Sequence, residues 1–128
     1  MAFALGNKPL PGYPMPLGDK IFHIFDHTGP ASYTQFTTPA TGGDVLKASS
    51  LSVGGFTEMK TAIDTTGQIA AYAVMNLAGY ANAVPSVILV YYSLVTATIG
   101  GQSQTIGTQI AASTNLSAIS WRLNAICV

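Results

Sequence analysis

The chain has few charged residues. Asp, Glu, Lys and Arg make up 8% of its 128 residues, against about 25% in ordinary soluble domains. The formal net charge is zero, so the sequence lacks the positive footprint expected of a protein that binds nucleic acid or an anionic membrane surface. From Thr65 to the end only Arg122 is charged. A solitary soluble protein normally keeps scattered charges, so this pattern favours a subunit covered by other protein over a neutral monomer coated with Thr, Ser, Gln and Asn.

Residues for catalysis and for metal binding are also scarce. Cys127 is the single cysteine, which excludes an intrachain disulfide and predicts a buried, unreactive thiol. His23 and His27 share one face of an expected strand but stand about 13 Å apart, and Asp26 points the other way. Gly42-Gly43 is not followed by the Gly-Lys-Ser/Thr of a phosphate loop, and no Gly-x-Ser-x-Gly elbow is present. We therefore predict a protein without catalytic residues, metal or cofactor.

The longest apolar run, Val87 to Ile99, is too short to cross a membrane. As a helix it would span about 20 Å, less than the roughly 30 Å of a bilayer core. Its Val, Ile, Tyr and Thr content favours a strand, which would be about 43 Å long. Such a strand is apolar on both faces, so both need cover. Contact between subunits is one explanation and a closed sandwich is the other. The faces carry Val87, Leu89, Tyr91, Val95 and Ile99 on one side and Ile88, Val90, Tyr92 and Leu94 on the other.

The remaining pattern predicts a mainly β protein. Strands are expected over 20–29, 56–64, 86–99 and 117–128, while 68–80 fits either a strand or a helix. Residues 43–48 are expected to form a turn or one helical turn, and the polar, Gly-containing stretch 100–109 a connection between strands. In the last strand Trp121 and its alternate neighbours face inward, whereas Arg122 faces outward. We predict a single antiparallel β-sandwich or barrel over residues 19–128.

Residues 1–18 are expected to form an extended N-terminal arm. Four prolines in this stretch disfavour both a helix and a sheet ladder, and we expect no secretory signal because it lacks a basic region and a long apolar region. Its apolar residues suit an arm laid across the same subunit or a neighbour, although a flexible terminus is the alternative. The predicted protein-interface residues are Phe3, Leu5, Leu10, Tyr13, Met15 and Leu17 on the arm, and Val90, Tyr92 and Leu94 on one face of the long strand.

Two segments resemble small virion proteins of tailed bacteriophages. They are "SYTQFTTPATGGDVLKASSLSVGGF" and "AASTNLSAISWRLNAI", separated by a long apolar β-region, so the similarity covers Ser32 to Ile126. In that group a Tyr-x-Thr-Gly-Gly-like turn precedes an Ala-Ser-x-Leu-like segment, and a late Thr-x-Asn-Leu-Ser-Ala segment leads into a last strand carrying Arg. Here Thr37-Thr38-Pro39-Ala40 intervenes before Gly42-Gly43, which departs from the pattern.

The resemblance implies a decoration or cement protein on the surface of an icosahedral phage head. Such proteins are β-rich, often trimeric, and bind the major capsid protein, in places through extended termini. The expected location is thus the virion, the expected state is a homo-oligomer, above all a trimer, and no nucleic acid or membrane is expected as a partner. Two other functions fit the sequence: a sugar- or receptor-binding β-sandwich of a virion fibre, with Tyr33 or Tyr80-Ala81-Asn82 as contacts, and a self-assembling coat or tail-tube subunit.

Overall fold

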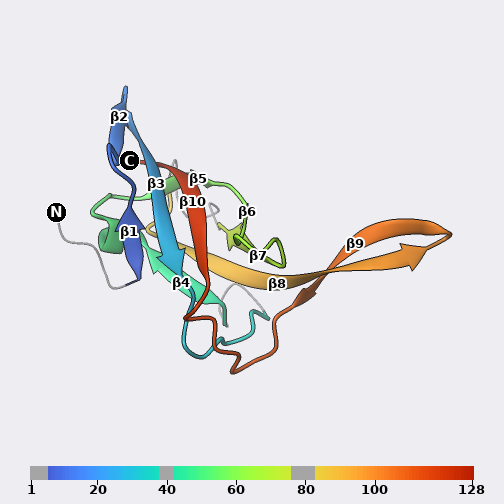
Figure 1. Cartoon of the computed structure of the whole chain (residues 1–128). Helices are drawn as coiled ribbons and strands as arrows, with labels where there is room; N and C mark the ends of the chain where they lie inside the picture. Colours follow the sequence, from blue (N-terminus) through green and yellow to red (C-terminus); the bar gives the residue numbers. More distant parts are fainter. Residues whose placement is uncertain (1–5, 38–41, 76–82) are drawn as a thin grey trace.

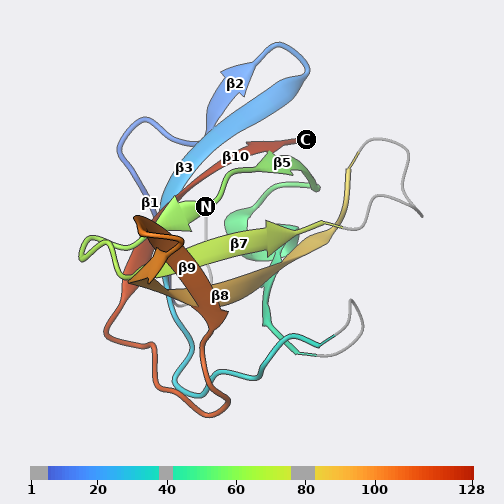
Figure 2. The same ribbon diagram turned by 90° about the vertical axis from the view of Figure 1, so that its right-hand side faces the viewer.

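The computed structural model describes residues 6–37, 42–75 and 83–128. They form two antiparallel sheets that pack face to face, in a sandwich-like arrangement with one four-residue 3₁₀ helix (Figures 1 and 2). The prediction of a mainly β fold is therefore confirmed. The elements are β1 (Asn7–Pro9), β2 (Met15–Leu17), β3 (Lys20–Thr28), β4 (Asp44–Lys47), η1 (Ala48–Leu51), β5 (Phe56–Met59), β6 (Ala62–Ile63), β7 (Ile69–Val74), β8 (Ser86–Ile99), β9 (Gln102–Gln109) and β10 (Ser120–Cys127).

The first sheet has the strand order β1-β3-β10-β5, and β2 also pairs with β3. β1 pairs with the end of β3, from Phe25 to His27, and β2 pairs with its beginning, from Lys20 to Phe22. The arm segment over 7–17 thus lies along the edge of its own domain. The expectation that proline would keep this segment out of a sheet ladder is wrong, because Pro9 and Pro16 sit in edge strands, where a missing backbone N–H can face solvent.

The second sheet has the order β4-β8-β7-β6, and β9 also pairs with β8. β8 is its central strand: β7 pairs with Ile88 to Ser93, while on the other side β4 pairs with Ser86 to Leu89 and β9 with Tyr92 to Ile99. β8 has the limits predicted from the sequence. β7 shows that the start of 68–80 is a strand; the rest of that prediction, from residue 76, lies outside the described residues.

The core lies between the two sheets. The inward residues of β10 alternate with outward ones, and Trp121, Leu123, Ala125 and Cys127 are all buried, as the sequence predicted. The Trp121 ring stacks on Tyr91 of the opposite sheet at 4.4 Å between centroids, and its Nε1–H donates to the carbonyl oxygen of Ile69 at 3.0 Å. One side chain therefore joins the sheets through both a ring contact and a hydrogen bond.

Three local predictions are corrected. Residues 43–48, expected to form a turn or one helical turn, contain strand β4, which pairs with β8 in the second sheet before η1 begins at Ala48. The strand expected over 56–64 is split into β5 and β6, which belong to different sheets. The stretch expected as a connection contains β9, because the Gly100-Gly101 turn returns the chain alongside β8.

The turn between β6 and β7 is organised by Asp64. Its Oδ1 accepts hydrogen bonds from the backbone N–H groups of Gln68 and Ile69 at 3.1 and 3.0 Å, and its Oδ2 accepts one from the Thr66 hydroxyl at 2.6 Å. Burial raises the pKa of Asp64, but the hydrogen bonds from Thr66, Ile69 and Gln68 outweigh that effect and leave the pKa below its ordinary value. The carboxylate form therefore stabilises the folded turn.

Replacing Asp64 with alanine is expected to lower the free energy of unfolding by about 1–2 kcal/mol, since three donors lose their acceptor. Asp64→Asn is the matched control, because its Oδ1 still accepts from both amides, and a smaller loss is expected. The carboxylate's contribution is present above the pKa of the unfolded chain and declines as the pH falls through the lower folded pKa. Urea unfolding of the three proteins at neutral and acid pH tests this; an equal acid dependence in wild type and Asp64→Asn would contradict it.

Candidate interaction surface

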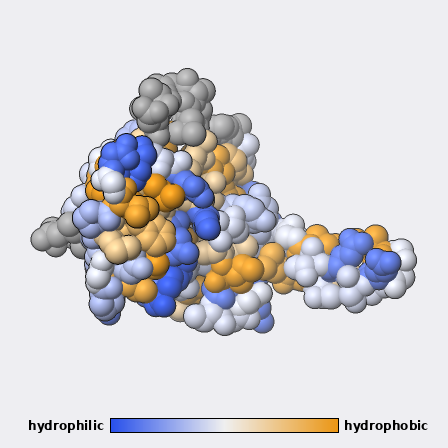
Figure 3. All heavy atoms as spheres, turned by 90° about the horizontal axis from the view of Figure 1, so that it is seen from above, coloured by the Kyte–Doolittle hydropathy of each residue, from blue (hydrophilic) through white to orange (hydrophobic). Residues whose placement is uncertain are grey.

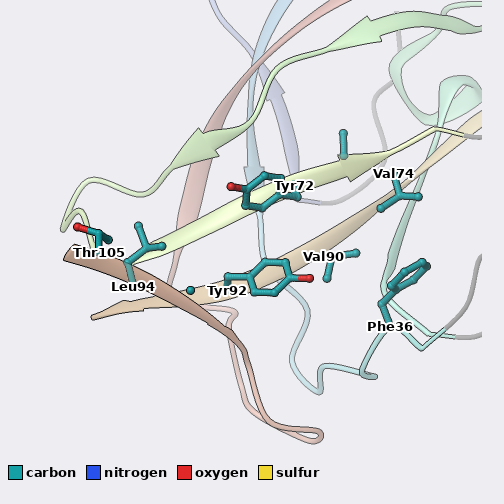
Figure 4. A pocket seen from close by; sticks show the side chains of 9 residues that line it. Phe36, Tyr72, Val74, Val90, Tyr92, Leu94 and Thr105 are labelled. Carbon is teal, nitrogen blue, oxygen red and sulfur yellow. The ribbon is translucent and has the colours of Figure 1, made fainter. Parts of the chain in front are cut away.

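The outer face of the second sheet carries an apolar groove with a volume of about 550 Å³. Strands β7, β8 and β9 supply most of its lining, and Phe36 closes one end (Figure 4). Its lining comprises Phe36, Tyr72, Ala73, Val74, Val90, Tyr92, Leu94, Thr105 and Gly107. Every one of these side chains is uncharged, so the groove suits an apolar contact rather than an ionic one.

Two tyrosines form the exposed rim of this groove. Tyr72 and Tyr92 meet edge to face at 5.4 Å between ring centroids, and Tyr72 remains 48% exposed. Val90, opposite Tyr72 in the register, is 1% exposed and lies between Tyr92 and Phe36 (Figure 4). A partner would thus contact the aromatic rim and not Val90.

Gln109, the last residue of β9, fixes Phe36 at the end of the groove. Its Oε1 accepts hydrogen bonds from the Phe36 N–H at 2.6 Å and from the Tyr33 hydroxyl at 2.9 Å, and its Nε2 donates to the Phe36 carbonyl at 3.1 Å. The amide therefore pairs with the backbone of Phe36 as a neighbouring strand would. The groove is held in shape by residues that are far apart in the sequence.

Beyond Ser93, strands β8 and β9 leave the body of the domain as a two-stranded ribbon (Figure 1). Pairing between β7 and β8 ends at Ser93, whereas pairing between β8 and β9 continues to Ile99 and Gln102. The turn consists of Gly100 and Gly101, both with positive φ, 59° and 81°, as a tight hairpin turn requires. We call the segment from Leu94 to Thr108 the ribbon. It projects as a slender extension in the space-filling view (Figure 3).

The two faces of the ribbon differ in polarity. Val95 pairs directly with Ile106, and Ile99 lies on the same face; these side chains are 50%, 36% and 48% exposed. The opposite face carries Thr96, Thr98, Ser103 and Thr105. The apolar face continues the face of β8 that packs in the core, but at the ribbon the first sheet no longer covers it. A two-stranded hairpin in water is only marginally stable, so the ribbon is suited to contact with another protein.

The sequence-predicted interface residues fall on two separate surfaces. Tyr92 and Leu94 line the groove with the buried Val90. On the arm, Met15 and Leu17 are 41% and 56% exposed, whereas Leu10 and Tyr13 are half-buried, with Tyr13 edge to face against Phe22 at 5.8 Å. β2 and the ribbon lie at opposite ends of the molecule (Figure 1). Phe3 and Leu5 lie outside the described residues.

A polar cluster links the two sheets near the C-terminal end of β3. The Asp44 Oδ2 accepts the Tyr91 hydroxyl at 2.6 Å and lies 2.7 Å from His27 Nε2, and His27 Nδ1 lies 2.6 Å from the Asn7 side-chain oxygen. Burial and then the charge of Asp44 raise the pKa of Tyr91, which keeps its hydroxyl protonated as a donor. His27, Asp44 and Tyr91 therefore form a connection between β3, β4 and β8.

The other titratable residues considered in the sequence analysis take part in packing or in hydrogen bonds within the domain. Burial lowers the pKa of His23, which favours its neutral form, and raises the pKa of the Cys127 thiol to about 11, so the thiol stays protonated at neutral pH. Asp26, on the outer face, accepts a hydrogen bond from Arg122 Nε at 3.0 Å. Within the described residues, no three His, Cys, Asp or Glu side chains gather closely enough to hold a metal ion.

Comparison with protein-family models gives no match. Comparisons with curated proteins and with solved structures also give no significant match. In the described part of the chain no helix has the length and hydrophobicity needed to span a membrane. The functional interpretation therefore rests on the groove, the ribbon and the arm described above.

Several surface residues were missed by the sequence-based prediction. Tyr72 and Phe36 belong to the groove, and Ile106 belongs to the ribbon. Ile106 could have been found, because a two-residue turn at Gly100-Gly101 sets a register in which it faces Val95. Phe36 gave no such signal, since its position depends on hydrogen bonds to Gln109 across 73 residues.

Proposed function

We propose that the protein is a non-enzymatic structural subunit of a virion, which binds the major capsid protein on the outside of a tailed-phage head and stabilises it. The observation that carries this proposal is the ribbon, which holds three exposed aliphatic side chains on one face and is uncharged throughout. Contacts of this kind bury apolar area at about 25 cal/mol per Å². Many symmetry-related copies add such contacts into strong attachment without requiring one tight site.

The groove and the arm support a role in attachment rather than in sugar recognition. A sugar-binding site needs aromatic rings beside acidic or amide side chains, and the groove lining has the rings without an Asp, Asn, Glu or Gln. Tyr33, one candidate for sugar contact, is 1% exposed. The other, Tyr80-Ala81-Asn82, lies outside the described residues. The exposed Met15 and Leu17 offer a second apolar contact at the far end of the molecule, so a single copy is able to bridge neighbouring shell subunits.

Co-sedimentation with purified phage heads from the genome that encodes the chain tests this function. We expect attachment to persist at roughly 1 M salt, where the Debye length is about 3 Å, because the proposed contacts are uncharged. Met15→Ser/Leu17→Ser is expected to reduce occupancy and to leave the fold intact, since both residues are exposed. Ile63→Ser is the matched control, because Ile63 is 55% exposed and belongs to β6 of the second sheet, whereas Met15 and Leu17 belong to β2 of the first.

Two results would contradict the proposal. Wild-type protein that stays in the supernatant at all salt concentrations would exclude attachment to the head. Large particles or tubes formed by the purified chain alone would favour the self-assembling coat or tail-tube subunit instead.

A further inference from the structure

The outer edge of β9 is an unprotected strand edge. Exposed edges invite pairing with other chains, and proteins guard them with prolines, charges or very short strands. The other described edge strands follow this rule: β6 has only two residues, and the rest carry a proline or a charge, namely Lys8 and Pro9 in β1, Pro16 in β2, Asp44 and Lys47 in β4, and Glu58 in β5. β9, with the sequence QSQTIGTQ, has neither over eight residues.

The free edge of β8 in the ribbon is less accessible than that of β9. Its first residue, Leu94, donates its backbone N–H to the carbonyl oxygen of Gln68 at 2.7 Å, so the turn between β6 and β7 lies against this edge. A strand added there would meet that turn. β9 lies on the opposite side of β8, and its residues from Gln102 to Thr108 are all exposed.

We infer that β9 pairs antiparallel with β9 of a second copy of this chain, about a two-fold axis at Ile106. In this register the two Ile106 side chains face each other, and each already pairs with Val95 of its own chain. A row of four aliphatic side chains would then cross a four-stranded sheet, β8-β9-β9-β8. Moving the axis to Thr105 would place Ile106 opposite Gln104 of the second copy and interrupt the row.

A second copy fits this edge better than a charged partner. The ribbon is uncharged, so two copies meet without repulsion and without leaving a charge buried and unpaired. A two-fold contact uses the same patch on both subunits and closes on itself. The dimer would therefore leave neither β9 edge free to pair with a third chain. This inference rests on the proposed role as an assembly subunit and names one partner of its ribbon.

The first test introduces a charge at the centre of the contact. Sedimentation velocity of the wild type is expected to show a dimer, or a larger assembly containing it, and Ile106→Lys is expected to abolish that contact because two ammonium groups would face each other. Ile63→Lys is the matched control and is expected to sediment like the wild type. Far-UV circular dichroism checks that both variants fold. A monomeric wild type, or an Ile106→Lys variant that associates as the wild type does, would overturn the inference.

The second test reads the register directly. Oxidised Ile106→Cys is expected to yield a disulfide-linked dimer, because facing residues of antiparallel strands have Cβ atoms about 4.5–5.5 Å apart. Ile63→Cys, at a more exposed position, is expected to stay unlinked, and the buried Cys127 does not compete. A wild-type trimer whose Ile106→Cys variant does not cross-link would point to a head-to-tail contact and overturn the inference. Head attachment by such a trimer would leave the proposed function standing.

Discussion

Replacing Trp121 with alanine is expected to lower the free energy of unfolding by about 3–5 kcal/mol, which is the range for removing a large aromatic side chain from a core. Trp121 is 1% exposed and stacks on Tyr91, with 25° between the ring planes. Alanine would leave a cavity between the two sheets and would also remove the donor to the Ile69 carbonyl. The expected loss is a large part of the free energy of unfolding of a typical domain, about 5–15 kcal/mol. The Trp121→Ala variant is therefore expected to be only marginally stable.

The control for this prediction is Trp121→Phe. Phenylalanine keeps most of the stacked ring and loses the hydrogen bond at 3.0 Å, so a loss intermediate between wild type and alanine is expected. Guanidinium unfolding followed by far-UV circular dichroism measures all three proteins, because both variants lack the single Trp and therefore tryptophan fluorescence. A loss under 1 kcal/mol for Trp121→Ala would show that the contact between the sheets does not depend on this ring.

Replacing Asp44 with alanine is expected to lower the free energy of unfolding by about 2–4 kcal/mol. The Tyr91 hydroxyl loses the acceptor that it reaches at 2.6 Å, and the His27 ring nitrogen loses its partner at 2.7 Å. Tyr91 is buried, and leaving a buried donor unsatisfied costs about 1–3 kcal/mol.

A double-mutant cycle separates this hydrogen bond from other effects of the substitution. Tyr91→Phe removes the hydroxyl and keeps the ring against Trp121. In the Asp44→Ala background Tyr91→Phe is then expected to cost little, because the Tyr91 hydroxyl has already lost its acceptor. The coupling energy is expected to exceed 1 kcal/mol. Strictly additive losses would contradict a shared network.

The stability of the domain and its proposed contacts use different residues. Trp121, Tyr91 and Asp44 act between the sheets, whereas Ile106 and Leu17 lie outside the core. Variants of the first group are thus expected to change unfolding, and variants of the second group to change association at unchanged stability. This separation makes the surface substitutions interpretable, because a lost contact would not be confused with a lost fold.

Strands with regular side-chain patterns were predictable from the sequence. Alternation places Trp121 inward and Arg122 outward in β10, and the β-branched run ending at Ile99 defines β8. β9 was not predictable from periodicity, because Gln, Ser and Thr on both faces carry no burial signal. β4 was missed for a related reason: Leu46 is its one buried side chain, and pairing with β8, rather than its own sequence, makes it a strand.

The interaction surface was predictable only in part. One face of β8 was identified from its apolar residues, yet whether that face is covered depends on what packs over it. Tyr91, on the face of β8 that packs in the core, is fully buried, while Val95, further along the same face, is half exposed. The difference arises because the first sheet ends before the ribbon begins, which residue spacing along the chain does not encode.

Local chemistry in the sequence by itself determined that the chain is β-rich, nearly uncharged after Asp64 and turned back at Gly100-Gly101. Those features follow from neighbouring residues, through side-chain alternation, backbone freedom of glycine and the placement of charge. Only the tertiary structure decided that β8 extends beyond the sandwich and pairs there with β9 to form an exposed ribbon. That outcome depends on where distant strands stop pairing, and hydrogen bonding between segments far apart in the chain sets those limits.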